Sequence, residues 1–437
     1  MKKFLAMLLA LVMALSLVAC GEKKDDTKTE GGDTATGSVY YLNFKPESDN
    51  AWKALAATYT EKTGVPVKIL TAASGEYEST LVSEMDKEDA PTLFQCNEGG
   101  VATWGEFCYD LSSSDVYNQL TSKDYALKNA DGEVISIGYC LETYGIIVNK
   151  ALLKEAGYEV TDITNFESLK KIADDIHSRA AELGFDAFTS AGLDGTSSWR
   201  FSGHLANMPL FYEFRDEGVT SKPATIKGTY LDNYKAIWDL YITDSATTGA
   251  ALLSATGDQA EAEFGEGKAV FYQNGTWEYS NLTGEKFGMN ADDLTMIPIY
   301  CGIEGEEKAG LCTGTENYWS VNKNASEEDI KATLDFMKWV VTSEEGTAMM
   351  AEQFGACPFQ ASKAPSNPFS ALANEYVANG CYPVTWAFNY TPAVNDWRAA
   401  VVDALGKYTA DGGSWDDVKT AFVEGWATQY NNDIANG

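Results

Sequence analysis

Residues that could carry out nucleophilic or metal chemistry are scarce in this 437-residue chain. Its only histidines are His177 and His204, and it has no Cys-x-x-Cys pair, Gly-x-Ser-x-Gly elbow, His-Glu-x-x-His motif or Walker loop. A zinc or iron–sulfur site would lack its usual ligand spacing. Any acid–base chemistry would fall on carboxylates, and 64 acidic residues make carboxylate pairs uninformative. We predict no enzymatic activity, catalytic residue, metal site or cofactor.

Aromatic and polar side chains are the better candidates for a binding chemistry. The chain has 11 Trp, 23 Tyr and 19 Phe, which leaves flat surface for a cleft beyond what the core uses. An aromatic plane can cover the flat face of a ligand, and carboxylate, amide or guanidinium groups can hydrogen-bond its polar atoms. Residues 274–278, with Trp277, and residues 194–200, with Trp199, combine these types. An ordinary core Trp and a loop anchored by a buried Trp are the alternative interpretations.

The elements that must position these groups alternate between strand and helix. β-rich runs at 39–43, 67–70 and 92–96 are separated by helical patterns at 49–62 and 76–87, which predicts a parallel sheet covered by helices. Ligands of such sheets bind at the carboxyl ends of the strands, where Glu47, Asn97 and Glu98 follow two of these runs. Each acid alone also fits a solvated surface charge. The later segments add strands at 146–148, 268–272 and 294–299 and helices at 150–156, 166–183 and 326–339.

The N-terminus reads as an export signal. Two lysines precede an uncharged, mostly apolar run over 4–19, which is short for a membrane-spanning helix. Residues 17–21 resemble a lipobox, in which Cys20 would receive the lipid, and residues 21–38 lack any large apolar side chain. We expect a signal peptide over 1–19, then a lipidated, palmitoylated Cys20 and a flexible tether over 20–38. The anchor would hold the protein on the outer face of the cell membrane of a Gram-positive bacterium. A plain signal peptide or membrane anchor with an incidental Cys is the alternative.

The net charge excludes one class of partner, and the cysteine count leaves two interpretations of the thiols open. The formal net charge of −32 repels nucleic acid phosphates and anionic lipid headgroups, so we expect no nucleic acid partner. Seven cysteines besides Cys20 remain, an odd number. Cys301 with Cys312, or Cys357 with Cys381, could form disulfides, and buried free thiols fit equally well.

Four stretches together resemble the family 1 extracellular solute-binding proteins. They are 91–100 (PTLFQCNEGG), 142–157 (ETYGIIVNKALLKEAG), 268–282 (KAVFYQNGTWEYSNL) and 340–346 (VVTSEEG), and the resemblance runs from about 39 to 431. It implies an α/β, two-lobed periplasmic-binding-protein-like fold of type II, with a three-strand hinge and a ligand cleft between the lobes. Lobe one would comprise 39–142 and 300–341, and lobe two 143–297 and 344–437. The hinge crossings would lie near 139–144, 297–300 and 341–344.

The same resemblance implies a function and a site. It implies a monomeric binding protein that captures an oligosaccharide and delivers this carbohydrate to the permease subunits of an ABC importer. Its interaction with the ATPase of the importer would be only indirect. Alternatives are a binder of a non-sugar solute such as iron, or a glycoside-active enzyme. Trp277 matches the cleft tryptophan of the family, residues 194–200 match a loop that reaches into the cleft, and Glu142 lies on the first crossing. The expected ligand-binding residues are Trp277, Glu278, Asn274, Trp199, Arg200, Asp194, Asn97, Glu98, Glu47, Glu142, Trp319, Trp386, Trp397 and Arg398.

Overall fold

The computed structural model of the chain describes residues 37–436. The expected signal peptide, Cys20 and all of the expected tether except residues 37 and 38 lie outside the described residues. Within the described part of the chain, no helix has the length and apolar character needed to cross a membrane. The seven cysteines of this part are all free thiols.

The first of two sheets carries the N-terminal strands. Its six strands lie in the order β2-β1-β3-β11-β5-β4. β1 pairs in parallel with β2 and β3, as the alternating sequence pattern predicts, while β11, β5 and β4 pair antiparallel with their neighbours. The strand bounds are β1 (Val39–Asn43), β2 (Val67–Thr71), β3 (Leu93–Phe94), β4 (Ala126–Lys128), β5 (Val134–Gly138) and β11 (Tyr318–Val321).

The second sheet has β6 at its centre. Its strands lie in the order β12-β10-β6-β8-β7, and β9 also pairs with β6. β6 runs antiparallel to β8, β9 and β10, and all eight of its residues are buried. The strand bounds are β6 (Glu142–Asn149), β7 (Asp186–Phe188), β8 (Ala269–Gly275), β9 (Leu294–Ile297), β10 (Ala309–Gly314) and β12 (Tyr382–Thr385).

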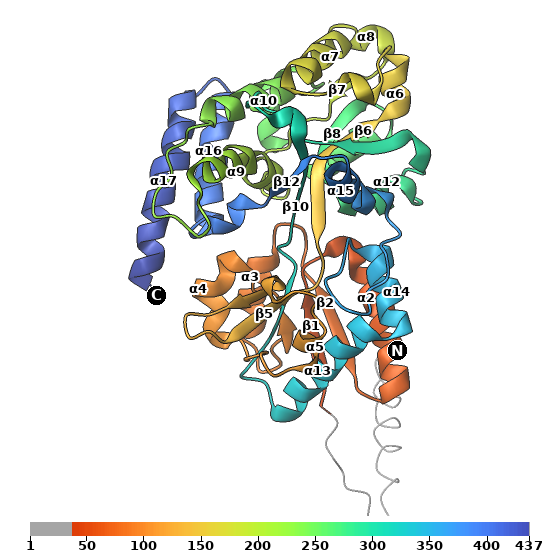
Figure 1. The fold of residues 1–437 in the computed structure, drawn as a ribbon, viewed down its shortest axis with the longest axis vertical. Coiled ribbons are helices and arrows are strands. Elements are labelled where there is room, and N and C mark those ends of the chain that lie inside the picture. The colour runs from red at the N-terminus through yellow and green to blue at the C-terminus, as the bar shows by residue number, and fades with distance from the viewer. Residues whose placement is uncertain (1–36, 437) are drawn as a thin grey trace, which may run out of the picture. The chain divides into compact units, whose positions relative to one another are not determined.

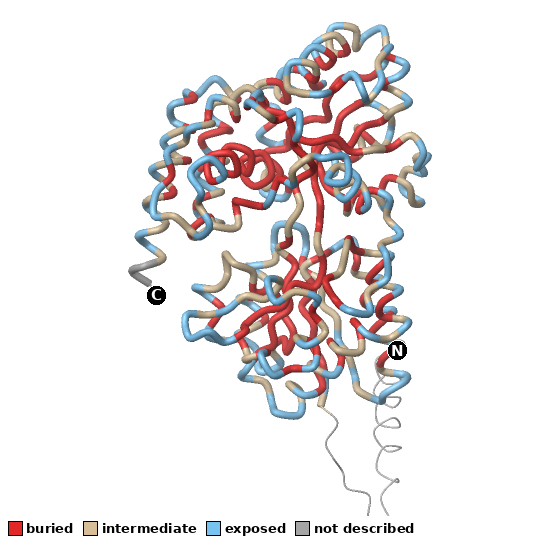
Figure 2. Tube along the Cα trace, viewed as in Figure 1, coloured by how far each residue is buried: buried red, intermediate tan, exposed pale blue. Residues whose placement is uncertain are grey.

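Helices surround both sheets, and the buried residues run along the strands (Figures 1 and 2). In α2 the predicted apolar face is buried, and Gly64 ends the helix in the left-handed conformation with φ 76°. The helices that pack with the first sheet are α2 (Asp49–Thr63), α3 (Tyr77–Met85), α4 (Val101–Trp104), α5 (Asp115–Asn118), α13 (Glu327–Thr342) and α14 (Glu344–Gln353). The helices that pack with the second sheet are α6 (Lys150–Glu155), α7 (Phe166–Ser178), α8 (Ala180–Leu183), α9 (Ala206–Glu217), α10 (Leu231–Thr243), α11 (Gly257–Gly265), α12 (Tyr279–Thr283), α15 (Pro368–Ala378), α16 (Val394–Thr409) and α17 (Trp415–Asn436).

The chain passes between the sheets at three places, of which the sequence locates one. The first crossing, at 139–141, joins β5 to β6 as expected. The second joins β10 to β11 at 315–317 rather than at 297–300, because β9 stays paired with β6. The third lies in the segment 354–367, after α14, because α14 packs on α2 and its Met350 joins the core of the first sheet. Residues 309–314 therefore belong with the second sheet and 344–353 with the first, contrary to the expected lobe boundaries.

Candidate ligand-binding site

An aromatic cluster lies beside the start of β6. The ring centroids of Trp199 and Trp277 are 6.1 Å apart, and His204 lies 4.9 Å from the first indole and 5.5 Å from the second. His204 stacks face to face on Tyr144 of β6, with centroids 3.7 Å apart and planes within 6°. Both indoles are half-buried, whereas His204 and Tyr144 are buried. The structure thus brings together the two tryptophans for which the sequence predicts ligand stacking.

Trp277 is positioned by the residues at the end of β8. A Cβ on Gly275 would lie 2.2 Å from the Trp277 indole, so the ring occupies the space that any other side chain would fill. The Asn274 amide nitrogen donates to the Glu278 carboxylate over 2.8 Å and to the Tyr272 hydroxyl over 2.7 Å. Its amide oxygen accepts from the Gly275 N–H over 2.9 Å. Asn274 therefore shapes the turn and fixes Glu278, with its own polar atoms already bonded.

The loop with Trp199 is held from within. The Asp194 carboxylate accepts hydrogen bonds from the hydroxyls of Thr196 and Ser197, each over 2.7 Å. The Trp199 indole N–H donates to the Thr196 carbonyl over 2.9 Å. Asp194 thus stabilises the loop that presents Trp199, which differs from the ligand contact expected for it.

A buried ion pair that sequence reasoning missed connects the first sheet to this cluster. Lys45, in the loop after β1, contacts the carboxylates of Glu142 over 2.7 Å and Glu47 over 3.1 Å, with its side chain 9% exposed. Its ammonium also lies 5.1 Å from the Trp277 ring centroid. Although burial opposes the charge, the two carboxylates raise the pKa of Lys45 above its usual range. Asn317, on the second crossing, donates to the other Glu142 oxygen over 2.7 Å.

Several buried polar atoms next to the indoles have no hydrogen-bond partner among the described residues. They include Nε and Nη2 of Arg200, Oε1 of Gln273 and Oε2 of Glu278. Arg200 is only 2% exposed. Burial, followed by repulsion from Glu261, raises the pKa of Glu278 to about 8, and the Arg200 charge opposes the shift. Buried polar atoms without partners are costly, so packing among the described residues does not account for this group.

A second polar group includes Glu98 and Arg398. Tyr318 of β11 donates to the Glu98 carboxylate over 2.7 Å, and burial raises the pKa of Glu98 to about 7. The Arg398 guanidinium lies 3.6 Å from the Glu316 carboxylate. Asn97 accepts from the Gly100 N–H over 3.1 Å, so its side chain closes a turn. A small pocket here is lined by Asn97, Glu98, Gly99, Glu316, Phe388, Asn389 and Val394.

The remaining predicted tryptophans, Trp319, Trp386 and Trp397, are all buried. Trp319 is fully buried in the first sheet, stacked on Tyr139 at 4.6 Å. Trp397 is 1% exposed and donates its indole N–H to the Phe422 carbonyl over 2.9 Å. The structure does not bring these two side chains to the indole cluster, because each belongs to the packing of its own sheet and helices. Trp386 lies nearer, 5.4 Å from Tyr144 at a tilt of 36°.

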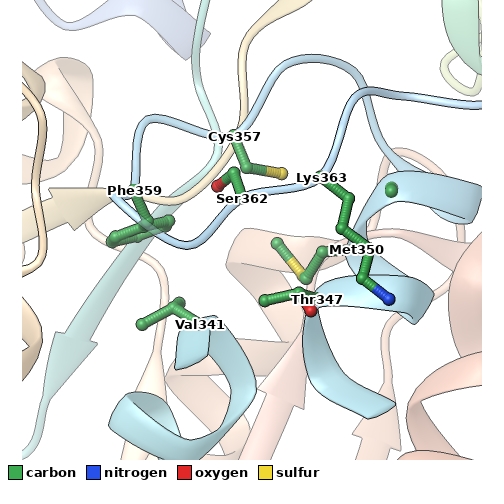
Figure 3. A pocket seen from close by; sticks show the side chains of 8 residues that line it. Val341, Thr347, Met350, Cys357, Phe359, Ser362 and Lys363 are labelled. Carbon is green, nitrogen blue, oxygen red and sulfur yellow. The ribbon is translucent and has the colours of Figure 1, made fainter. Parts of the chain in front are cut away.

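A separate pocket lies away from the predicted residues, between α13, α14 and the segment after them (Figure 3). Its lining is mainly apolar, with the Lys363 stem and the Cys357 thiol at its edge (Figure 3). None of the residues expected to bind the ligand lines it. The lining residues are Val341, Thr347, Met350, Ala351, Cys357, Phe359, Ser362 and Lys363.

Two residues of the site were missed by sequence reasoning although signals for both were present. Lys45 lies two residues before Glu47 in the same strand-end loop, where only the acid drew attention. His204 follows Arg200 by four residues and is one of two histidines in the chain. For His204, the signal in the sequence was a rare residue type close to Trp199, for which an aromatic ligand contact is predicted.

Comparison with known proteins identifies the family. The family model described as "Bacterial extracellular solute-binding protein" matches residues 54–379. The chain is 23% identical over 345 residues to the maltodextrin-binding protein MdxE of Bacillus subtilis, covering 76% of this chain and 75% of that one. It is 22% identical over 351 residues to a maltooligosaccharide ABC transporter solute-binding lipoprotein of Streptococcus pneumoniae, covering 77% and 75%.

Solved structures share the architecture. The binding protein RafE in complex with raffinose superposes with a TM-score of 0.71 at 16% identity, covering 91% of this chain and 100% of that one. The two-lobed α/β fold that the sequence predicts is thereby confirmed. Because the family model spans most of the chain, this protein belongs to the bacterial extracellular solute-binding proteins.

Proposed function

We propose that this protein is the receptor of an ABC importer for an oligosaccharide, which it binds between the two sheets. The observation that carries the proposal is the pair of half-buried indoles of Trp199 and Trp277, which lie 6.1 Å apart with the polar side chains of Lys45 and His204 beside them. Flat rings suit the C–H faces of sugars, and polar side chains beside the rings suit the hydroxyls. Relatives named for maltodextrin and maltooligosaccharide support this class of ligand.

The energy needed is modest. A micromolar dissociation constant corresponds to about −8 kcal/mol, which a few stacking contacts and charge-assisted hydrogen bonds can supply. Receptors of importers must also release the solute, so a very tight complex would slow transport.

The partners follow from the same proposal. The receptor would work as a monomer, pass its sugar to the membrane permease and touch the ATPase only through it. Cys20 would carry the lipid that holds the protein on the outer face of the membrane, and residues 21–38 would be the tether. The relative named as a lipoprotein supports this placement.

A thermal-shift panel of sugars tests the proposal. Maltotriose, raffinose, stachyose and simple monosaccharides would each be added to the purified protein. A sugar at a hundred times its dissociation constant stabilises the folded state by about 2.7 kcal/mol, which raises the melting temperature clearly. Chromatography of the same mixtures should show the sugars intact. The proposal fails if no oligosaccharide raises the melting temperature, or if the sugars are cleaved.

A further inference from the structure

His204 is held rigidly at the centre of the aromatic cluster. It belongs to a π-helical turn, Arg200–Leu205, that follows the loop with Trp199. Its ring is stacked on Tyr144, with Trp199 and Trp277 on its other sides. A ring confined in this way has one orientation, so its two nitrogens have fixed directions.

The contact with Gln273 indicates which nitrogen of the ring carries the proton. The Gln273 amide nitrogen lies 3.1 Å from Nδ1 of His204. With the amide nitrogen facing the ring, Nδ1 accepts, and a neutral ring in this arrangement carries its hydrogen on Nε2. Burial, followed by the charges of Arg398, Arg200 and Lys45, lowers the pKa of His204 well below its usual range and keeps the ring neutral.

The Nε2 atom is free to meet a ligand. Among the residues that the structure describes, Nε2 has no hydrogen-bond partner, and it is not one of the atoms sealed from solvent. We propose that His204 is a ligand-contacting residue whose Nε2–H donates a hydrogen bond to one oxygen of the bound sugar. This inference rests on the proposed function. A hydrogen-bond donor of fixed direction requires an acceptor oxygen at one position, so His204 would help determine which sugars bind.

The two histidines make a direct measurement possible. In protein labelled with ¹⁵N-histidine, the sugar that gives the largest thermal shift should move the Nε2 and Hε2 resonances of His204. His177 is the internal control, since it is 40% exposed and bonded to Asp186 over 2.8 Å. Its signals should stay in place.

Variants separate the donor from the stacked ring. His204→Phe keeps the aromatic face on Tyr144 and removes the donor, so we expect about tenfold weaker binding. The matched control, His177→Asn, should bind within twofold of the unaltered protein. Gln273→Met removes the partner of Nδ1 and should shift the ¹⁵N signature of His204 toward the other tautomer. A deoxy sugar that lacks the oxygen bound by His204 should bind the unaltered protein and His204→Phe with equal affinity.

The outcomes are distinguishable from those that test the proposed function. If no oligosaccharide binds the unaltered protein, the proposed function fails and this inference fails with it. If a sugar binds while the His204 resonances stay in place and His204→Phe binds within twofold, only this inference is overturned. The resonance measurement needs no variant, so it decides the matter even if His204→Phe does not fold.

Discussion

At the scale of single residues, the half-buried indole of Trp277 should contribute more to binding than to folding. Its ring contacts Trp199, His204 and the Lys45 ammonium, and part of it remains open to solvent. We predict that Trp277→Ala weakens sugar binding by at least about tenfold, because a stacking contact is lost together with its buried area. Calorimetric titration with the best sugar of the panel measures this loss.

Trp319 is the matched control for that change. Its indole is fully buried among Tyr41, Trp52 and Tyr139. Trp319→Ala should lower the free energy of unfolding by about 3–5 kcal/mol, the usual cost of removing a buried aromatic ring. Trp277→Ala should lower it far less. Equal losses of stability in urea unfolding would contradict the division of these two tryptophans between site and core.

The sequence could not make this division by itself. All four residues of β11 are buried, so the strand shows no alternation of apolar and polar positions from which to tell where Trp319 points. Lys45 shows the converse limit. In so acidic a chain a lysine resembles a surface counter-charge, and its burial depends on packing against Glu142, 97 residues away. Trp277 could be singled out because it lies in the turn that follows a strand, and its contact with a ligand stays a prediction.

At the scale of elements, the end of β8 is built to seat an indole. Because a Cβ on Gly275 would lie within 2.6 Å of three atoms of the Trp277 ring, Gly275→Ala should displace that ring. We expect sugar affinity to fall about as much as in Trp277→Ala, with a change in tryptophan fluorescence of the free protein. Gly412→Ala is the control, since its nearest atom would be at 3.6 Å. Unchanged affinity in Gly275→Ala would contradict this role.

The ion pair between the β1 loop and β6 should stabilise the arrangement of these two elements. Lys45→Met would leave Glu142 buried without its cation, which costs about 3–5 kcal/mol. Adding Glu142→Gln should restore part of that loss, because the uncompensated charge is removed. A double-mutant cycle in urea measures the coupling.

Exposed pairs provide the comparison for that cycle. Lys331 and Asp335, 78% and 53% exposed on α13, form a surface pair four residues apart. Lys331→Met should change the free energy of unfolding by less than about 1 kcal/mol. If Lys45→Met costs no more than Lys331→Met, the buried pair does not hold the β1 loop to β6.

The sequence predicted those helices and strands that have a local pattern of apolar residues. It did not predict features that depend on which strands pair with each other. β1, β2, α2 and α13 lie within a few residues of their predicted bounds, since each has a clear period and a clear end. The second crossing was misplaced because β9 and β10 are both short strands, and nothing local shows that both pair with β6. Long-range pairing is absent from a single sequence.

At the scale of the whole molecule, the sequence was most informative about class. Four stretches of the sequence resemble the family 1 extracellular solute-binding proteins, which implies a two-lobed binding protein, and the family match agrees. What the sequence did not show is that burial raises the pKa of two acids of this region, Glu98 and Glu278. That feature makes the stability of the entire fold depend on pH in a direction that can be worked out.

Glu278 sets the sign of this dependence. The folded protein holds the proton on Glu278 up to about pH 8, whereas an unperturbed glutamate loses it near 4.5. Between these values the folded state binds more protons, so the stability that this group provides is complete below about pH 4.5 and is lost as the pH rises through 8. Glu278→Gln cannot ionise. Variant and unaltered protein should therefore match near pH 4.5, and the variant should be more stable by several kcal/mol at pH 9, at about 1.4 kcal/mol per pKa unit.

Glu84 provides a control of opposite sign. Hydrogen bonds from Lys87 and Tyr40 lower the pKa of Glu84, so its contribution is present above the usual glutamate pKa and is lost as the pH falls through the lowered value. Glu84→Gln should thus be less stable than the unaltered protein at neutral pH, and the two should converge in acid. Urea unfolding of the sugar-free protein from about pH 2 to about pH 9 measures both variants. Parallel stability curves for Glu278→Gln and the unaltered protein would show that Glu278 ionises without cost, and that the site is more solvated than its burial indicates.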